Sequence, residues 1–442
     1  MSINLSILPY LDELSHSLES HHADKKMYGK ISSVVGTIVE CTGLEASVGE
    51  LYSIHTISER KIIAEAVGLR DGKTLLMPFD RTEGIKAGCL VEKLGQSLTI
   101  QTGSNMLGRV IDSNGNPIDD LGPLNCPNQM PVYSDPPSPL KRKKIDEVMK
   151  TGIRAIDALN TIGIGQRLGL FAGSGVGKSV LLSMIAQHSD ADINVIALVG
   201  ERGREVQEFI HETLGEEGLA RSVVVAVTSD MAAMSRVKGA FTATAIAEYF
   251  RDQGKNVLLM MDSVTRVAMA QREIGLASGE PPTTKGYTPS VFAILPKLLE
   301  RAGKTGNGSI TGLYTVLVDN DDMNEPIADA VRSILDGHIV LSRRLAHKNH
   351  YPAIDVLQSI SRVMPKIISD EERLIAMKAR ELIATYREAE DLINIGAYVK
   401  GSNPKIDESV KKIPELESFL IQDLMEADFR EDLWESLKKI IQ

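Results

Sequence analysis

Leu168-Gly-Leu-Phe-Ala-Gly-Ser-Gly-Val-Gly-Lys-Ser179 is the stretch of this sequence that decides the fold. An apolar strand leads into a glycine-rich turn that closes on Lys178 and Ser179, and residues 180–186 are typical of a helix. Glycines let the backbone curl so that successive N–H groups point inward, and the new helix adds its unpaired N–H groups and positive dipole end. The stretch predicts a phosphate-binding loop. A chance Lys-Ser after an ordinary glycine-rich loop is the alternative, which the flanking strand and helix disfavour.

The loop predicts a set of nucleotide contacts. Lys178 is expected to reach the β- and γ-phosphates, and the Ser179 hydroxyl is expected to hold Mg²⁺. The strict pattern begins with glycine where this chain has Ala172, which is small enough for the turn if its φ is negative. The residues expected to bind the nucleotide are Gly173, Ser174, Gly175, Val176, Gly177, Lys178, Ser179 and Val180.

Two further apolar runs end in carboxylates. The run 256–262 ends at Asp262, which is expected to hold Mg²⁺ through its water shell; a helix N-cap is the alternative role. The run 195–201 ends at Glu201, which is placed to orient and polarise water, and Arg202 follows as a group that can neutralise phosphoryl charge. An exposed ion pair at a helix start explains Glu201 and Arg202 equally well from the pattern alone.

Composition sets limits on the class of protein. A chain of 442 residues exceeds what one core usually supports, so two or three domains are expected. The 49 basic and 59 acidic residues give a formal charge of −10, which argues against a nucleic-acid ligand. The 3 cysteines have no CxxC spacing, so neither a disulfide framework nor a zinc site is expected. No apolar run suits a membrane span or a secretory signal, and a cytosolic location is predicted.

Pattern divides the chain into four parts. Residues 1–25 predict an amphipathic helical segment that either docks a partner or folds back on the protein. Residues 26–95 hold short β-rich pieces between turn signals, which predict a small closed β-barrel that serves assembly. Residues 96–345 begin with a connector over 96–150 and then alternate strands and helices, and residues 346–442 are helical.

The alternating region predicts a doubly wound α/β fold. Its apolar strands lack polar alternation, so a parallel sheet covered on both faces is expected, with ligand at the carboxyl ends of the strands. The expected strands are 168–172, 193–199, 222–228, 256–261, 311–318 and 338–341, after barrel pieces at 31–39, 51–57, 62–67 and 74–77. The expected helices are 179–187, 204–214, 236–252 and 289–302, followed by 371–392 and 410–421 in the last part.

Several motifs together carry a resemblance to a known family. They are the phosphate-binding loop, Thr151-Gly-Ile-Arg-Ala-Ile-Asp157, Gly200-Glu-Arg-Gly-Arg-Glu-Val-Gln-Glu-Phe209 and Tyr351-Pro-Ala-Ile-Asp355. In this order they resemble the hexameric rotary ATPase superfamily, and within it the type III secretion ATPases. Ile393-Asn-Ile-Gly-Ala-Tyr398 before Gly401-Ser-Asn-Pro404 resembles the flagellum-specific export ATPases most. The resemblance covers nearly the whole chain and implies a RecA-like ATPase domain between the barrel and the helical C-terminal part.

The resemblance implies roles for individual residues. Lys178 and Ser179 match the phosphate and metal contacts, Glu201 matches the catalytic glutamate, and Asp262 matches the Walker B aspartate. Tyr351 matches a tyrosine that stacks on adenine, where an aromatic face offers dispersion without base specificity.

Arg362 is the sharpest of these implied roles. Ser359-Ile-Ser-Arg-Val363 resembles the arginine-finger segment of the noncatalytic subunit in ATP synthase. Because this chain carries both Glu201 and Arg362, the resemblance implies a homo-oligomer in which each copy presents its arginine to the phosphates of a neighbour. An ordinary surface arginine before a helix is the alternative.

The family also implies cofactors, partners and competing functions. It implies ATP with Mg²⁺, a homo-hexamer, a regulatory or stator protein at the N-terminus, a central stalk-like protein, export substrates with chaperones, and a peripheral position at a membrane export gate. A flagellar export ATPase is expected, with a virulence-type secretion ATPase as the alternative. An ATP synthase catalytic subunit fits less well, since residues 203–206 read Gly-Arg-Glu-Val where Thr-Arg-Glu-Gly is expected. A noncatalytic subunit is expected to lack Glu201, and the acidic charge disfavours an RNA-translocating hexamer.

Overall fold

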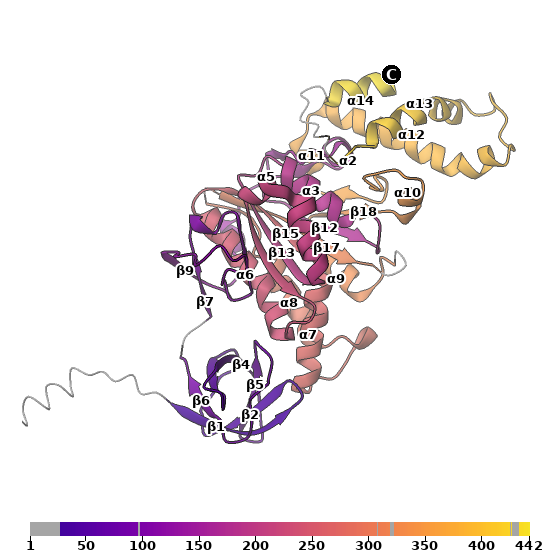
Figure 1. Ribbon diagram of the computed structural model, residues 1–442. Helices are drawn as coiled ribbons and strands as arrows, with labels where there is room; N and C mark the ends of the chain where they lie inside the picture. The colour runs from indigo at the N-terminus through magenta and orange to yellow at the C-terminus, as the bar shows by residue number, and fades with distance from the viewer. Residues whose placement is uncertain (1–26, 96–97, 307, 319–321, 425, 427–432) are drawn as a thin grey trace, which may run out of the picture. The chain divides into compact units, whose positions relative to one another are not determined.

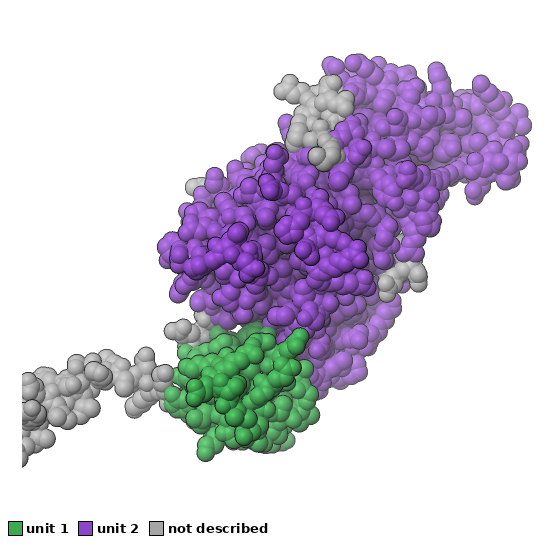
Figure 2. All heavy atoms as spheres, in the orientation of Figure 1, with its two compact units in different colours: residues 1–96 green, residues 97–442 purple. Residues whose placement is uncertain are grey.

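The computed structural model describes residues 27–95, 98–306, 308–318, 322–424, 426 and 433–442 (Figure 1). The chain forms two compact units, residues 1–96 and residues 97–442, which Figure 2 shows in different colours. The predicted N-terminal helical segment, residues 1–25, lies outside the described residues.

The first unit is a closed antiparallel barrel in the order β1-β2-β5-β4-β3-β6, as predicted. Its strands are β1 (Tyr28–Val35), β2 (Ile38–Thr42), β3 (Leu51–His55), β4 (Lys61–Arg70), β5 (Lys73–Pro78) and β6 (Leu90–Lys93). Buried side chains such as Tyr52, Ile54 and Leu76 fill its interior. The single strand expected over 31–39 is wrong: Gly36, with φ of 60°, turns the chain there and splits the run into a hairpin.

The connector, residues 96–150, forms strands that belong to the second unit. β7 (Thr99–Thr102) pairs with β9 (Asn128–Pro131), and β8 (Arg109–Ile111) adds a parallel edge strand beside β14 (Ser222–Thr228). A tight turn follows β8 at Asp112, whose backbone N–H and carboxylate both form hydrogen bonds with nearby backbone groups. The connector thus contributes one strand, β8, to the central sheet, while β7 and β9 form a separate two-stranded sheet.

The centre of the second unit is a sheet of nine strands in the order β19-β18-β12-β17-β15-β13-β14-β8, with β16 added to β17. The further strands are β12 (Arg167–Ala172), β13 (Ile193–Glu201), β15 (Asn256–Asp262), β16 (Gly303–Thr305), β17 (Gly308–Leu317), β18 (Gly337–Leu341) and β19 (Ile360–Ser361). All pairs along this order are parallel except β18 with β19. The core strands are buried along nearly their whole length, which confirms the predicted parallel sheet covered on both faces.

Helices cover both faces of this sheet. α6 (Ala233–Asp252) and α7 (Val264–Ser278) pack on one face together with α8 (Pro289–Leu299). α3 (Lys178–His188) and α5 (Gly215–Ala220) belong to the core on the other face. The helix expected over 204–214 is present as α4 (Gly203–Glu208) continuing into a π-helical turn, η4 (Phe209–Leu214). Shorter helices are α2 (Arg154–Leu159), α9 (Pro326–Ile334), α10 (Arg343–His347) and α11 (Met364–Ile367).

The last part of the chain is helical, as predicted. α12 (Asp370–Asn394) begins with a capping box between Ser369 and Glu372, and it pairs with α13 (Pro404–Leu420) in an antiparallel hairpin (Figure 1). α14 (Leu433–Ile441) packs against both helices. Within the described ranges no helix combines the length and the apolar character that crossing a membrane requires.

Candidate active site

The phosphate-binding loop has the backbone that its sequence predicts. Ala172 ends β12, and the positive φ values fall instead on Gly175 and Gly177, at 77° and 87°. Only glycine adopts these conformations without strain, which lets the chain turn tightly before α3 begins at Lys178. Ala172 therefore substitutes for the usual glycine at no conformational cost. Val176 is buried under the loop, so only its backbone is available to a ligand.

Three charged side chains converge beside this loop. Lys178 Nζ lies 2.5 Å from Asp262 Oδ1 and 3.6 Å from Glu201 Oε1. Asp262 ends β15 and Glu201 ends the adjacent strand β13, so the parallel sheet itself delivers both carboxylates to one edge. The Thr315 hydroxyl, from the neighbouring strand β17, donates a hydrogen bond of 2.8 Å to the same Oδ1 of Asp262.

The Glu201 carboxyl has an unusual protonation equilibrium. Burial raises its pKa to about 7, the Lys178 ammonium opposes this shift, and the charge of Asp262 adds to it. A carboxylate with a pKa near the working pH is suited to accept a proton from water. The arrangement of Lys178, Glu201 and Asp262 can bind phosphate, orient water and support a cation.

The structure decides between two pairs of alternatives at the strand ends. Ser263, not Asp262, caps α7, since its Oγ accepts the backbone N–H of Arg266; the N-cap alternative for Asp262 is therefore wrong. Glu201 is buried, so it is not an exposed ion pair. The side chain of Arg202 is 78% exposed and pairs with Glu205, and the structure does not bring it to Lys178.

Tyr351 lies next to the phosphate-binding loop. A Cβ atom built on Gly177 would sit 3.4 Å from Tyr351 Cε1, so the ring passes close to the loop backbone. Tyr351 is 39% exposed and lines a cavity of about 560 Å³, a size that suits a nucleoside. The other lining residues are Gly175, Gly177, Val180, Leu181, Met184, Leu341, Asn349, Pro352, Ala353, Ile421, Gln422, Asp423 and Leu424.

Arg362 lies at the opposite end of the sheet from the loop of its own chain. β19 pairs with the first residues of β18, Ser361 opposite Gly337, whereas the loop leaves the sheet where Ala172 pairs with Leu341. At ~3.3 Å per residue the two ends are roughly 15 Å apart along the strands. The Arg362 side chain is exposed. An arginine at this position cannot reach phosphates held at Lys178 of the same chain.

Comparison with known proteins identifies the family. Residues 31–95 match the beta-barrel domain of the ATP synthase alpha/beta family, residues 152–361 match its nucleotide-binding domain, and residues 368–439 match the T3SS EscN ATPase C-terminal domain. The chain is 56% identical over 411 residues to the flagellum-specific ATP synthase of Bacillus subtilis (strain 168), covering 92% of this chain and 93% of that protein. The chain belongs to the flagellar and type III secretion ATPases.

Solved structures agree with this membership. The assembled ATPase EscN of the enteropathogenic E. coli type III secretion system is similar with a TM-score of 0.88 and 47% identity, over 94% of this chain and 100% of that one. EscN in complex with its central stalk EscO gives a TM-score of 0.86 and 48% identity over the same shares. This ATPase therefore has the fold that the sequence predicts, binds nucleotide and hydrolyses ATP in type III export.

Some residues of this ATPase lie at the site although the sequence analysis did not select them. Arg266, in the first turn of α7, packs against Gly200 and lowers the pKa of Glu201 through its charge. Its Nε is buried and has no hydrogen-bond partner among the described residues. Its position just after Asp262 was the available signal. Gln422 and Leu424 line the cavity of Tyr351 but follow α13, and no local pattern indicates that this segment returns to the loop.

Proposed function

We propose that this chain is the ATPase of a flagellar protein export apparatus, and that it acts as a homo-hexamer whose active sites are shared between neighbouring copies. The observation that carries the shared site is the placement of Arg362 at the far end of the sheet from Lys178. One copy holds the phosphate loop and the buried Glu201, and only a second copy can supply Arg362 to them. EscN, a relative of this chain, has been solved as an assembled ATPase, which supports the oligomer.

Flagellar export is favoured over virulence-type secretion by the relatives. The flagellum-specific enzyme of Bacillus subtilis shares 56% of residues with this chain, against 47% for EscN. Deleting the gene in its own bacterium is expected to abolish flagellar filaments, and restoring it with Glu201→Gln is expected to leave the cells without them. Loss of host-directed secretion with filaments intact would identify the virulence-type alternative.

In the proposed mechanism each side chain has a separate task. Lys178 and the loop backbone bind the β- and γ-phosphates, and Glu201 positions a water in line with the γ-phosphate and takes its proton. The Ser179 hydroxyl, in the first turn of α3, and the Asp262 carboxylate are hard oxygen donors, and they would suit a Mg²⁺ that keeps most of its water shell. A Mg²⁺ held by these two residues would supply positive charge to the phosphates of the nucleotide. Tyr351 holds the adenine against the loop.

Partners beyond the oligomer are part of this proposal. By analogy with EscN and its central stalk EscO, a stalk-like protein is proposed to engage the assembled ring. A regulatory or stator protein at the N-terminus, export substrates with their chaperones, and a peripheral site at a membrane export gate complete it. In this proposal Arg202 contributes only if α4 reorients it when nucleotide binds.

A complementation experiment tests the shared site. Glu201→Gln chains and Arg362→Ala chains are each expected to be inactive alone, but mixed rings contain interfaces where an intact glutamate faces an intact arginine. Partial recovery of ATP hydrolysis is the expected result, and co-purification through two different tags verifies mixing. Two inactive variants that co-assemble without recovering activity would contradict the proposal.

A further inference from the structure

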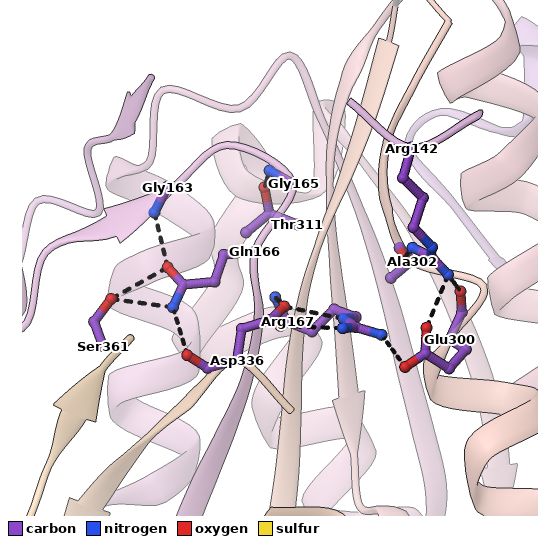
Figure 3. A network of polar contacts seen from close by, with 10 residues as sticks. All are labelled: Arg142, Gly163, Gly165, Gln166, Arg167, Glu300, Ala302, Thr311, Asp336 and Ser361. Carbon is purple, nitrogen blue, oxygen red and sulfur yellow. Dashed lines mark hydrogen bonds and ion pairs between the residues drawn. The ribbon is translucent and has the colours of Figure 1, made fainter. Parts of the chain in front are cut away.

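Hydrogen bonds join Gln166 to Ser361 and Asp336 (Figure 3), and Arg362 directly follows Ser361 in the chain. The Arg362 backbone N–H donates to the carbonyl of Asp336 at 3.0 Å, and the preceding residue, Ser361, is almost fully buried. The side-chain amide of Gln166, a residue that is 0% exposed, lies between Asp336 and Ser361. Its Nε2 donates to Ser361 Oγ at 3.0 Å and to the Asp336 carbonyl at 3.3 Å.

The other end of the same amide is fixed as well. Gln166 Oε1 accepts the backbone N–H of Gly163 at 2.9 Å, so both polar atoms of the side chain have partners (Figure 3). A buried amide with all its contacts made has one favourable orientation, because any rotation leaves a buried polar atom unpaired. Gln166 thus acts as a fixed reference for the segment that carries Arg362.

Asp336 is held from the opposite side by charge. Arg167 contacts its carboxylate three times, through the backbone N–H at 3.1 Å and through Nε and Nη2 at 3.0 Å each. The same guanidinium lies 2.5 Å from Glu300 Oε1, and Arg142 reaches the other oxygen of Glu300 at 2.9 Å. Such a bidentate, multiply paired arrangement is geometrically restrictive.

The strand pairing leaves no slack at this point. A Cβ atom on Gly337 would lie 2.4 Å from the Ile360 carbonyl oxygen, so β19 approaches β18 as closely as a glycine permits. Arg362 therefore follows directly on a segment that is held in place by the close backbone contact, by Gln166 and by the Arg167–Asp336 ion pair. An ordinary surface arginine does not need a backbone fixed in this way. A guanidinium group that must contact phosphates in another subunit needs a fixed backbone, because its position must be accurate.

We infer that Gln166, at the start of the strand that leads to the phosphate-binding loop, is a positioning residue that sets the place of Arg362 for the neighbouring active site. The inference rests on the shared site proposed above. Gln166 touches no part of its own nucleotide site, since it stands at the opposite end of β12 from Lys178. Its loss is therefore expected to harm the neighbour's reaction and not nucleotide binding by its own chain.

The decisive experiment is Gln166→Leu, which keeps the volume and removes the hydrogen bonds. Misplacement by about 1 Å can cost roughly 10²-fold in rate, so kcat of the pure variant is expected to fall by that order while affinity for ATP is unchanged. Mixed with Glu201→Gln chains, Gln166→Leu chains are expected to regain activity, because their intact Glu201 then faces a well-placed arginine of the other variant.

Two parallel mixtures make the outcomes distinct. In one mixture Glu201→Gln chains are combined with Arg362→Ala chains, and in the other with Gln166→Leu chains. If activity recovers only in the mixture with Arg362→Ala, Gln166 serves its own site, which overturns the inference but not the shared site. No recovery in either mixture, despite verified co-assembly, overturns the shared site and the inference with it. Recovery in both supports the inference.

Control variants separate positioning from folding. Thr311→Val removes the hydroxyl that accepts the Gly165 backbone N–H at 2.9 Å in the same turn, yet touches neither Ser361 nor Asp336. It is expected to retain activity within twofold of wild type. If Gln166→Leu does not fold, Ser361→Ala removes the same contact from the other side and is expected to show the same recovery. A Thr311→Val defect that Glu201→Gln chains also rescue would overturn the specific role of Gln166.

Discussion

Lys178, the first residue of α3, and Asp262, the last residue of β15, form an ion pair in which Nζ lies 2.5 Å from Oδ1. The lysine that we propose to bind phosphate is thus paired with a carboxylate of the same site. ATP must compete for that ammonium group, and the charge of Asp262 must be screened while the phosphates approach.

Asp262→Asn is expected to separate nucleotide affinity from Mg²⁺ dependence. Removing the carboxylate frees Lys178 and removes a repulsive charge, so binding of ATP in the presence of a chelator is expected to tighten by roughly tenfold, about the value of one charged hydrogen bond. The gain on adding Mg²⁺ is expected to shrink, and hydrolysis to be lost. Calorimetric titration with and without Mg²⁺ measures both effects. Thr315→Val, which removes a hydroxyl that contacts Asp262 Oδ1 and the Met261 carbonyl but leaves the carboxylate in place, is the control and is expected to keep Mg²⁺-dependent binding.

Glu201→Gln is expected to abolish hydrolysis while nucleotide binding remains. The amide keeps the size of the side chain but cannot accept a proton from water, and loss of a positioned base typically costs ~10²–10⁴ in rate. The release of phosphate measures turnover, and the fluorescence of a labelled nucleotide measures binding. Turnover within twofold of wild type would remove Glu201 from the mechanism.

The pH dependence of kcat/KM is expected to follow the Glu201 carboxyl. Its pKa is raised to about 7 by burial, and only the ionised form accepts a proton, so kcat/KM rises as pH increases through about 7 and levels off above it. The residual rate of Glu201→Gln is expected to lack this rise. A midpoint near 4.5, the ordinary value for glutamate, would contradict the burial of the working carboxyl.

The features that local sequence patterns encode could be predicted before the fold was known. The loop at Lys178, the strand ends at Glu201 and Asp262, and the parallel sheet all follow from apolar runs and turn residues that are adjacent in the chain. The prediction of one strand over 31–39 was wrong because the apolar pattern continues past Gly36. The chain reverses direction there through the positive φ of this glycine, which the pattern does not indicate.

The remaining parts of the site depend on long-range contacts. The Gln422 backbone N–H donates to the Tyr351 carbonyl at 2.9 Å, although α12 and α13 separate the two residues. No periodicity indicates that return. The direction of the Arg202 side chain could not be predicted from the sequence either, because it depends on where α4 starts. Arg202 is the N-cap residue of α4, and its side chain points to solvent and pairs with Glu205.

Tyr351→Ala is expected to weaken ATP binding without changing the chemistry at the phosphates. Stacking of a base on an aromatic side chain is worth ~1–3 kcal/mol, so the affinity for ATP is expected to fall by roughly 5- to 100-fold. Tyr351→Phe keeps the ring and is expected to bind as wild type does. Inorganic tripolyphosphate, which has no base, should bind both variants equally. A similar loss for tripolyphosphate would show that Tyr351 shapes the loop beside Gly177 rather than an adenine site.

Activity per chain is expected to rise steeply with protein concentration. Arg362 stands at the opposite end of the sheet from Lys178, so a single copy holds an incomplete site. An arginine supplied in trans contributes ~10³–10⁵ in rate in other phosphoryl-transfer enzymes, and dilution below the assembly threshold removes it. Specific activity measured over a dilution series, alongside mass photometry of the same samples, is expected to track the fraction of assembled chains. Arg362→Ala should show a low specific activity that does not change with concentration even where rings form. Full specific activity of monomers, or normal turnover by Arg362→Ala, would show that the site is complete within one chain.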